Sequence, residues 1–363
     1  MRYSLPFFFI VIFVCSFNQK VIAKASVFEY KNYTPKENSL VRVAIVDLSK
    51  AKLVIGRAQD LGRGLDTVEN IAKHYDAVVA VNGGFFRFNS TEFNNAVPAG
   101  ILKINNDWHG IAYKARGAVG WDSQTAEMLF DILQTDSRML IKNKRFPINA
   151  MNKVSSGNKA TLLSDSYYDT INVSSSLALL ILNQRINTIY NNGIVSVPKH
   201  GYIYDVSGGM RQNMSDIKPG DSAVVDIKLK PHFAKDKTKL WNKLPNVLGG
   251  GPLLINNSKK ITDFSMERMN SDFIYSNYAR TAIGVLPDKR VVLVVAEQPS
   301  LHTIVGLSIP ELRDFMYSLG CIFALNLDGG RSSNMYTTGY CCPAEITDIT
   351  QHQVADALLV IPN

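Results

Sequence analysis

Residues that could take part in chemistry are concentrated in the stretch 326–333, which reads Asn-Leu-Asp-Gly-Gly-Arg-Ser-Ser. Consecutive glycines let main-chain N–H groups approach a ligand without a Cβ in the way, which favours an anion. The pattern therefore indicates a site for an anionic, hydroxyl-rich substrate, although Asp-Gly-Gly is also ordinary turn chemistry. The candidate residues of this stretch are Asn326, Asp328, Gly329, Gly330, Arg331, Ser332 and Ser333.

Two segments of similar design are expected to position these residues. The first is a helix with an acidic cap at Asp66, which leads into an apolar strand at 77–81. The second is a helix with the capping box Ser308–Glu311, followed by a strand at 321–325. The first strand ends in Asn82, Gly83 and Gly84, and the second delivers the stretch 326–333. Because ligands often bind at strand ends in α/β arrangements, we expect the two ends to meet at one edge of a sheet.

Further blocks give the chain a resemblance to a known family. A third glycine-rich turn lies at 249–251, and a strand begins with Arg280 and Thr281. With these blocks the chain resembles the phosphodiester glycosidases, in order and approximate spacing from about residue 40 to the end. The matching blocks are 81–86, 249–254, 280–284, 326–330 and 354–360.

The chain departs from the pattern of that family at three places. Arg331 stands where the family usually has a third glycine, and Asp356 stands where it more often has Asn. The loop 297–300 replaces a segment that is often rich in Asp and Gly. The identity of the substrate is therefore not carried over with the resemblance.

The resemblance implies cleavage of the bond between a sugar anomeric carbon and a phosphodiester. The leaving group would be a phosphate monoester with a second pKa of about 6, so a strong general acid matters less than in most glycosidases. We assign Asp328 as base or nucleophile, and Arg280 as phosphate clamp because a guanidinium matches phosphate oxygens in bidentate fashion. Asn82 and Asn326 would orient hydroxyls or the carboxylate. The alternative for Arg280 is a buried ion pair that ties loops together.

Other positions complete the predicted site. Amides around the glycine pairs are expected to line the pocket, and three carboxylates are unranked candidates for a partner of Asp328. The substrate-binding positions are Gly83, Gly84, Gly250, Gly251, Thr281, Asn326, Gly329, Gly330, Arg331, Ser332 and Ser333. The candidate partner carboxylates are Glu267, Asp263 and Glu297.

Several alternatives stay open at this point. A catalytically silent protein that binds envelope glycans could keep the same turns. A serine hydrolase built on Ser332 or Ser333 is disfavoured because no Gly-x-Ser-x-Gly elbow surrounds them. A divalent cation that bridges Asp328, an Asn side chain and the phosphate is chemically reasonable. The sequence does not decide whether a metal is bound, and the metal is left unknown. Zinc is disfavoured, since the cysteines and histidines lack ligand spacing.

The N-terminus reads as a signal peptide at 1–25, followed by a lead segment at 26–39. A basic residue, a short apolar run and Ala-Lys-Ala predict cleavage and export to the periplasm or outside, with an uncleaved anchor as the alternative. No stable membrane span is expected after cleavage. The net charge of +8 is spread along the chain, so nucleic acid is not expected, while a phosphorylated glycan is. Oligomeric state cannot be predicted.

The region 40–363 is expected to form one α+β domain, a strand-rich mixed sheet with a few helices. Its glycine-rich strand-end loops would form one site. Hairpins are predicted at 40–56 and 281–296, with strand-rich segments at 98–133 and 172–230. Cys321 either pairs with one of the vicinal cysteines, Cys341 or Cys342, or is a buried strand residue.

Overall fold

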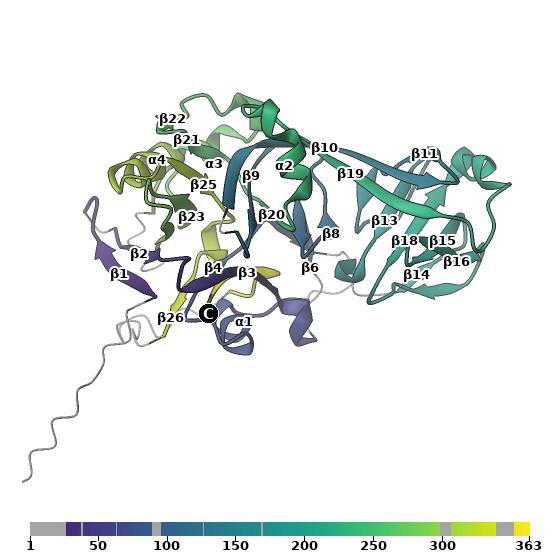
Figure 1. Cartoon of the computed structure of the whole chain (residues 1–363), viewed down its shortest axis with the longest axis horizontal. Coiled ribbons are helices and arrows are strands. Elements are labelled where there is room, and N and C mark those ends of the chain that lie inside the picture. Colours follow the sequence, from purple (N-terminus) through teal and green to yellow (C-terminus); the bar gives the residue numbers. More distant parts are fainter. Residues whose placement is uncertain are drawn as a thin grey trace, which may run out of the picture.

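The computed structural model describes residues 27–37, 39–62, 64–88, 96–125, 127–167, 170–297, 306–338 and 352–363. Strands dominate these residues and helices are few and short, so the predicted strand-rich α+β class is confirmed. The strands are divided among several sheets, and nearly all their pairings are antiparallel (Figure 1). The predicted leader at 1–25, Cys341 and Cys342 lie outside the described residues.

Two sheets carry the predicted site segments. The seven-stranded sheet has the order β1 (Phe28–Tyr33), β2 (Val41–Val46), β24 (Val291–Ala296), β23 (Arg280–Val285), β25 (Phe323–Asn326), β21 (Leu253–Asn256) and β22 (Lys259–Lys260). The four-stranded sheet has the order β26 (Met335–Thr337), β4 (Val79–Asn82), β27 (Asp356–Pro362) and β3 (Ala51–Arg57).

Of the remaining sheets, the five-stranded one extends the molecule to the right in Figure 1, whereas the larger one lies in the middle. One has the order β11 (Lys144–Pro147), β10 (Glu127–Ile141), β9 (Arg116–Asp122), β20 (Asn246–Gly249), β7 (Leu102–Ile104) and β8 (Asp107–Gly110), with β19 (Ala223–Pro231) also on β10. A five-stranded sheet has the order β12 (Ala150–Met151), β13 (Ala160–Leu163), β18 (Tyr202–Ser207), β15 (Ser176–Leu182) and β16 (Arg185–Tyr190). Two short pairs are β14 (Thr170–Asn172) with β17 (Ile194–Ser196), and β5 (Phe86–Phe88) with β6 (Ala96–Pro98).

The α-helices are α1 (Val68–His74), α2 (Thr238–Lys243), α3 (Ser271–Tyr275) and α4 (Ile309–Ser318). Short 3-10 segments lie at Ala58–Leu61, Asp165–Tyr167, Gly208–Met214, Lys235–Lys237, Ser265–Glu267 and Gly330–Ser332. In the part of the chain that the structure describes, no helix has the length and apolar character needed to cross a membrane.

A shared core lies between the two sheets that carry the site. Side chains of β24 alternate between two cores: Val292 and Val294 pack in the one that holds α4, and Leu293 packs in the shared one. On β27, Leu358 packs in the shared core and Leu359 packs with α1. Both strands are therefore buried on both faces, with a helix covering each sheet on the side away from the shared core.

The strands of the first predicted hairpin form, but they do not pair with each other. β2 is flanked by β1 and β24, while β3 pairs with β27 in the other sheet. The turn between β2 and β3 carries the chain from one sheet to the next, so the prediction of a hairpin at 40–56 was wrong. The hairpin at 281–296 is confirmed as β23 and β24. Several short strands confirm the strand-rich segments 98–133 and 172–230.

The two helix starts are formed as local sequence predicts, with one shift. Ser308 and Glu311 form the predicted capping box, in which the Ser308 hydroxyl accepts from the Glu311 N–H at 3.3 Å. At α1 the cap is Thr67 rather than Asp66, because the Thr67 hydroxyl accepts from the Asn70 N–H at 3.1 Å. The Asp66 carboxylate instead accepts from the Thr67 N–H at 2.8 Å.

Cys321 is a buried residue at the start of the β25 segment. Its thiol forms no disulfide with any described residue, and burial raises its pKa to about 12. Cys321 is therefore buried as expected, but it lies two residues before β25 rather than in the strand, and its pairing with Cys341 or Cys342 stays a prediction.

Candidate active site

The two predicted strand ends meet, at the junction between two sheets rather than at one edge of a sheet. The Asn82 side-chain N–H at the end of β4 donates to the Asp328 carbonyl at 2.8 Å. The Asp328 N–H in turn donates to the Gly83 carbonyl at 3.2 Å. These bonds place the loop after β25 directly against the glycine pair after β4.

The Asn82 amide is fully buried and bonds only to protein groups. Its Oδ1 accepts from the Thr281 hydroxyl at 2.6 Å and from the Asn334 N–H at 3.3 Å. Asn82 and Thr281 are 1% and 0% exposed. Both side chains thus hold the backbone around Asp328 in place, while any direct contact with a substrate stays a prediction.

The glycines after β4 allow a carboxyl group to approach the main chain. A Cβ at Gly83 would lie 1.9 Å from an Asp356 carboxyl oxygen, so no other residue fits without a shift. The Gly83 N–H donates to the Asp356 carbonyl at 2.9 Å, and the Gly84 N–H donates to its carboxyl at 2.8 Å. These amides were expected to line a ligand pocket; in the structure they bind Asp356 instead.

Asp328 and Asp356 form a pair of carboxyl groups with raised pKa values. Burial raises the pKa of Asp328 to about 6, while interactions with the Ser332 hydroxyl and the Gly329 N–H oppose the rise. Burial, followed by the charge of Asp328, raises the pKa of Asp356 to about 7, against the lowering effect of the Gly84 N–H and Arg57. Asp328 is partly exposed and Asp356 is 3% exposed, so we expect Asp328 to ionise first and Asp356 to be about half protonated at neutral pH.

Sequence reasoning missed Asp356 as the neighbouring carboxyl group. A signal was present, because an Asp in the apolar run Val354–Val360 is out of keeping with a buried strand. Which strand would pair with β4 could not be read from the sequence, so nothing connected Asp356 to Gly83.

The three candidates named instead have other partners. Glu267 is buried and accepts from the Gly117 and Leu253 N–H groups at 2.7 and 2.8 Å. Glu297 forms an ion pair with Arg42 at 2.7 Å. The exposed Asp263 accepts from the Ser265 N–H at 2.8 Å. Their contacts give them structural roles.

The glycine turn after β20 packs against Asn326. The Gly250 N–H donates to the Gly117 carbonyl and the Gly251 N–H to the Asn326 carbonyl, so neither amide is free for a ligand. A Cβ at Gly250 would lie 2.3 Å from the Asn326 carbonyl oxygen. Asn326 Nδ2 donates to the Gly251 and Leu327 carbonyls at 2.7 Å each, and its Oδ1 has no partner among the described residues.

Arg280 is 1% exposed and lies next to the Asp328 loop. Its Nε donates to the Leu307 carbonyl at 2.8 Å, and one Nη donates to the Phe273 and Ser276 carbonyls at 2.7 and 2.9 Å. Among the described residues the guanidinium has no ion-pair contact, although the Asp272 carboxylate interacts with it electrostatically. Burial lowers the pKa of Arg280 to about 10, which leaves it charged at neutral pH.

The rest of the Asp328 loop surrounds these groups. The Gly329 N–H donates to the Asp328 carboxylate at 2.9 Å, and a Cβ at Gly329 would lie 3.9 Å from the Arg280 Cδ. Gly330 has a φ of +61° and donates to the Ala279 carbonyl at 2.7 Å. Arg331 is exposed, and the Ser333 hydroxyl is buried without a partner among the described residues.

The residues that the structure describes contain no group of three or more His, Cys, Asp or Glu that could hold a metal ion. A cation at Asp328 would need oxygens from Asn side chains and from the substrate. The possibility of a divalent cation therefore stays a prediction.

Comparison with known proteins gives both a family match and structural neighbours. A model of the phosphodiester glycosidase family matches residues 178–361. No curated protein matches the chain. A hypothetical protein from Synechocystis superposes with a TM-score of 0.73 at 21% identity, over 93% of this chain and 62% of its own length. A Burkholderia pseudomallei protein described as exported has a TM-score of 0.72 at 20% identity, over 89% of this chain and 74% of its own. These two likenesses concern the fold alone.

Asp356→Asn tests the buried carboxyl group through stability. A folded pKa of about 7 lies above the unfolded value of about 3.9, so the stabilisation by the bound proton is full below the unfolded pKa and is lost as pH rises through 7. Asn does not ionise and can still accept from Gly84. The free energy of unfolding, measured with urea, should rise for the variant relative to the wild type by roughly 2 kcal/mol between pH 5 and pH 8.

Asp263→Asn is the matched control, because the Asp263 carboxylate is exposed and its pKa is lowered. Its stability relative to the wild type should not rise with pH. An equal difference between Asp356→Asn and the wild type at both pH values would show that Asp356 ionises normally.

Proposed function

This chain belongs to the phosphodiester glycosidase family, and from that premise we propose that it is a hydrolase of sugar-1-phosphodiesters. The reaction would release the sugar and a phosphate monoester. Its substrates would be phosphorylated glycans of the cell envelope or of the extracellular space.

The observation that carries this proposal is a buried guanidinium beside a carboxylate loop. Arg280 is charged, desolvated and hydrogen-bonded only to carbonyls among the described residues. The Asp272 carboxylate stabilises the charge of Arg280 electrostatically without an ion-pair contact, and the Phe273 and Tyr278 rings cover the guanidinium at 4.8 and 5.2 Å. A phosphodiester anion would supply a counter-charge in direct contact. The Asp328 loop packs directly against this arginine, because the Gly330 N–H donates to the Ala279 carbonyl at 2.7 Å and a Cβ at Gly329 would lie 3.0 Å from the same carbonyl.

Asp328 would act at the sugar. In the ionised form it takes a proton from the attacking water, or attacks the anomeric carbon itself, as the bond from that carbon to the phosphate oxygen breaks. The phosphate leaves with the bonding electron pair, and Arg280 stabilises the charge that develops on it. Since a phosphate monoester has a second pKa of about 6, it does not need a proton in order to leave.

Asp356 would contribute by remaining neutral. Between pH 6 and pH 7, its pKa of about 7 keeps Asp356 mostly protonated while most of Asp328 is ionised. A second carboxylate at this place would repel an anionic substrate. We therefore expect the rise of kcat/KM with pH to follow Asp328, with an apparent pKa near 6.

Asp328→Asn is the main test of this mechanism. The change keeps size and hydrogen-bonding capacity but removes the charge, so turnover of a sugar-1-phosphodiester should fall by about 10³-fold or more. Asp356→Asn is the control: it should keep activity and the rise near pH 6. Near-normal turnover in a folded Asp328→Asn protein would refute the assignment, and loss of activity in Asp356→Asn alone would move the role to Asp356.

Arg280→Lys tests the phosphate contact. Lysine keeps a charge but loses the planar fork, so kcat/KM should fall by about 10²-fold and inhibition by inorganic phosphate should weaken. Arg313→Lys serves as control, because Arg313 also donates to a carbonyl, that of Ile261, at 3.1 Å. If Arg280→Lys folds and phosphate inhibits it as strongly as the wild type, Arg280 only ties loops together.

Export is a further part of the proposal, and it rests on the leader pattern at 1–25. The protein recovered from its host should begin near residue 26. Intact mass spectrometry measures this directly. A mass that still contains residues 1–25 would favour an uncleaved anchor.

A further inference from the structure

A second cleft lies away from Asp328 and has a volume of about 690 Å³. One wall contains residues of β3 and the hairpin of β7 and β8, and the opposite wall contains the turn between β15 and β16 and the segment 199–202. Its size is that of pockets that enclose small organic ligands. Nothing in the predicted mechanism uses it.

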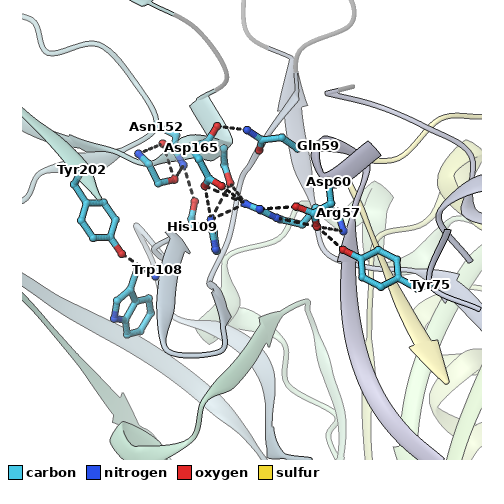
Figure 2. A network of polar contacts seen from close by, with 11 residues as sticks. Arg57, Gln59, Asp60, Tyr75, Trp108, His109, Asn152, Asp165 and Tyr202 are labelled. Atoms are coloured by element: carbon cyan, nitrogen blue, oxygen red, sulfur yellow. Dashed lines mark hydrogen bonds and ion pairs between the residues drawn. The ribbon is translucent and has the colours of Figure 1, made fainter. Parts of the chain in front are cut away.

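An ion-pair network fixes the interior of this cleft (Figure 2). Arg57 bonds to both carboxyl oxygens of Asp165 at 3.0 Å on one side and to Asp60 at 2.6 Å on the other. His109 Nδ1 lies 3.1 Å from Asp165. Because Arg57, Asp60 and Asp165 pair with one another, the network gives the cleft a rigid polar interior.

Two tight turns present free amide side chains at the cleft. Asn105 and Asn106 have φ values of 49° and 76°, and Asn183 and Gln184 have 48° and 59°. Asn105 and Asn106 are fixed by main-chain bonds, for example from the Asn106 N–H to the Pro245 carbonyl at 2.9 Å. All four side chains are exposed, line the cleft and have no hydrogen bond within the described chain.

The charge of the cleft argues against an anionic ligand. Its cationic side chains are Arg57 and Lys199, and its carboxylates are Asp60, Asp107 and Asp165. The three carboxylates outnumber the two cations, and Arg57 is paired with Asp60 and Asp165, so the charge does not favour a phosphate or a nucleic acid. Amides both donate and accept, which suits ligands whose groups do the same.

Aromatic side chains complete the lining. The wall of the cleft includes Tyr75, Trp108 and Tyr202. The Tyr202 hydroxyl accepts a hydrogen bond from the main-chain N–H of Trp108 at 3.1 Å. Aromatic rings offer apolar faces beside polar edges, and sugar rings have the same mixture of CH faces and hydroxyl edges. The lining as a whole matches a neutral, hydroxyl-rich ligand.

We propose that this cleft binds a short neutral oligosaccharide through the amides of its two turns. Arg57, on the wall, is the cross-strand partner of Asp356, so the cleft begins one strand away from the carboxyl pair. The sugar chain of a glycan could therefore lie in the cleft while its phosphodiester is at Asp328. This last point rests on the proposed function, whereas saccharide binding does not.

The test is calorimetric titration of the full chain with chitotriose, maltotriose and cellotriose. Asn106→Gly combined with Gln184→Gly removes one amide from each turn, and each turn then reads Asn-Gly, a sequence that favours this backbone conformation. At least one trisaccharide should bind the wild type, and the double variant should bind it at least about fivefold more weakly. Asn143→Gly, an equivalent change in a turn outside the cleft with φ of 64°, should bind it normally.

If none of the three trisaccharides binds at millimolar concentration, the inference is wrong. Equal affinity in the wild type and the double variant would also overturn it. A second comparison asks whether the cleft binds a separate saccharide or the sugar chain of the substrate itself. If the substrate's own chain occupies the cleft, a trisaccharide-1-phosphodiester should have a lower KM than the monosaccharide-1-phosphodiester; otherwise the two KM values should be equal. Should both phosphodiesters resist hydrolysis while a trisaccharide binds, the proposed function fails and the cleft remains a saccharide site.

Discussion

The buried amide of Asn82 holds together the parts from which the site is built. It bonds to the Thr281 hydroxyl on β23 and to the Asp328 carbonyl and the Asn334 N–H, which lie in the connection between β25 and β26. These bonds cross from the four-stranded sheet to the seven-stranded sheet, above the apolar core that the sheets share. Loss of these hydrogen bonds would leave a buried amide without partners, which costs free energy of folding. The bonds of Asn82 therefore favour one relative position of the two strand ends.

This fixed position sets the electrostatics of the site. Gly83 lets Asp356 come against the backbone, where burial and the nearby charge of Asp328 disfavour its ionisation. On the other side, Gly329 lets the loop pack closely against the Ala279 carbonyl and the backbone of Arg280. The glycines thus serve close packing of polar groups rather than offering their amides to a ligand. Two carboxyl groups with raised pKa values beside a buried arginine are the result.

Local patterns predicted much of this, and long-range pairing explains what they missed. The capping box at Ser308 and the hairpin of β23 and β24 depend on neighbours in sequence, and both were predicted. The separation of β2 from β3 depends on partners far along the chain. The same limit hid Asp356, whose contact with Gly84 spans most of the sequence. The cleft near Arg57 also joins distant segments, so no motif marks it.

The central claim is that departure of phosphate, assisted by Arg280, drives the reaction without strong acid catalysis. Rates on a sugar-1-phosphodiester and on a simple alkyl glycoside of the same sugar test it most directly. An alkoxide needs a proton as it leaves, whereas a phosphate oxygen already spreads its charge. The account predicts rapid cleavage of the phosphodiester and no measurable cleavage of the alkyl glycoside. Equal rates on both would indicate a conventional two-carboxylate glycosidase and would contradict the account.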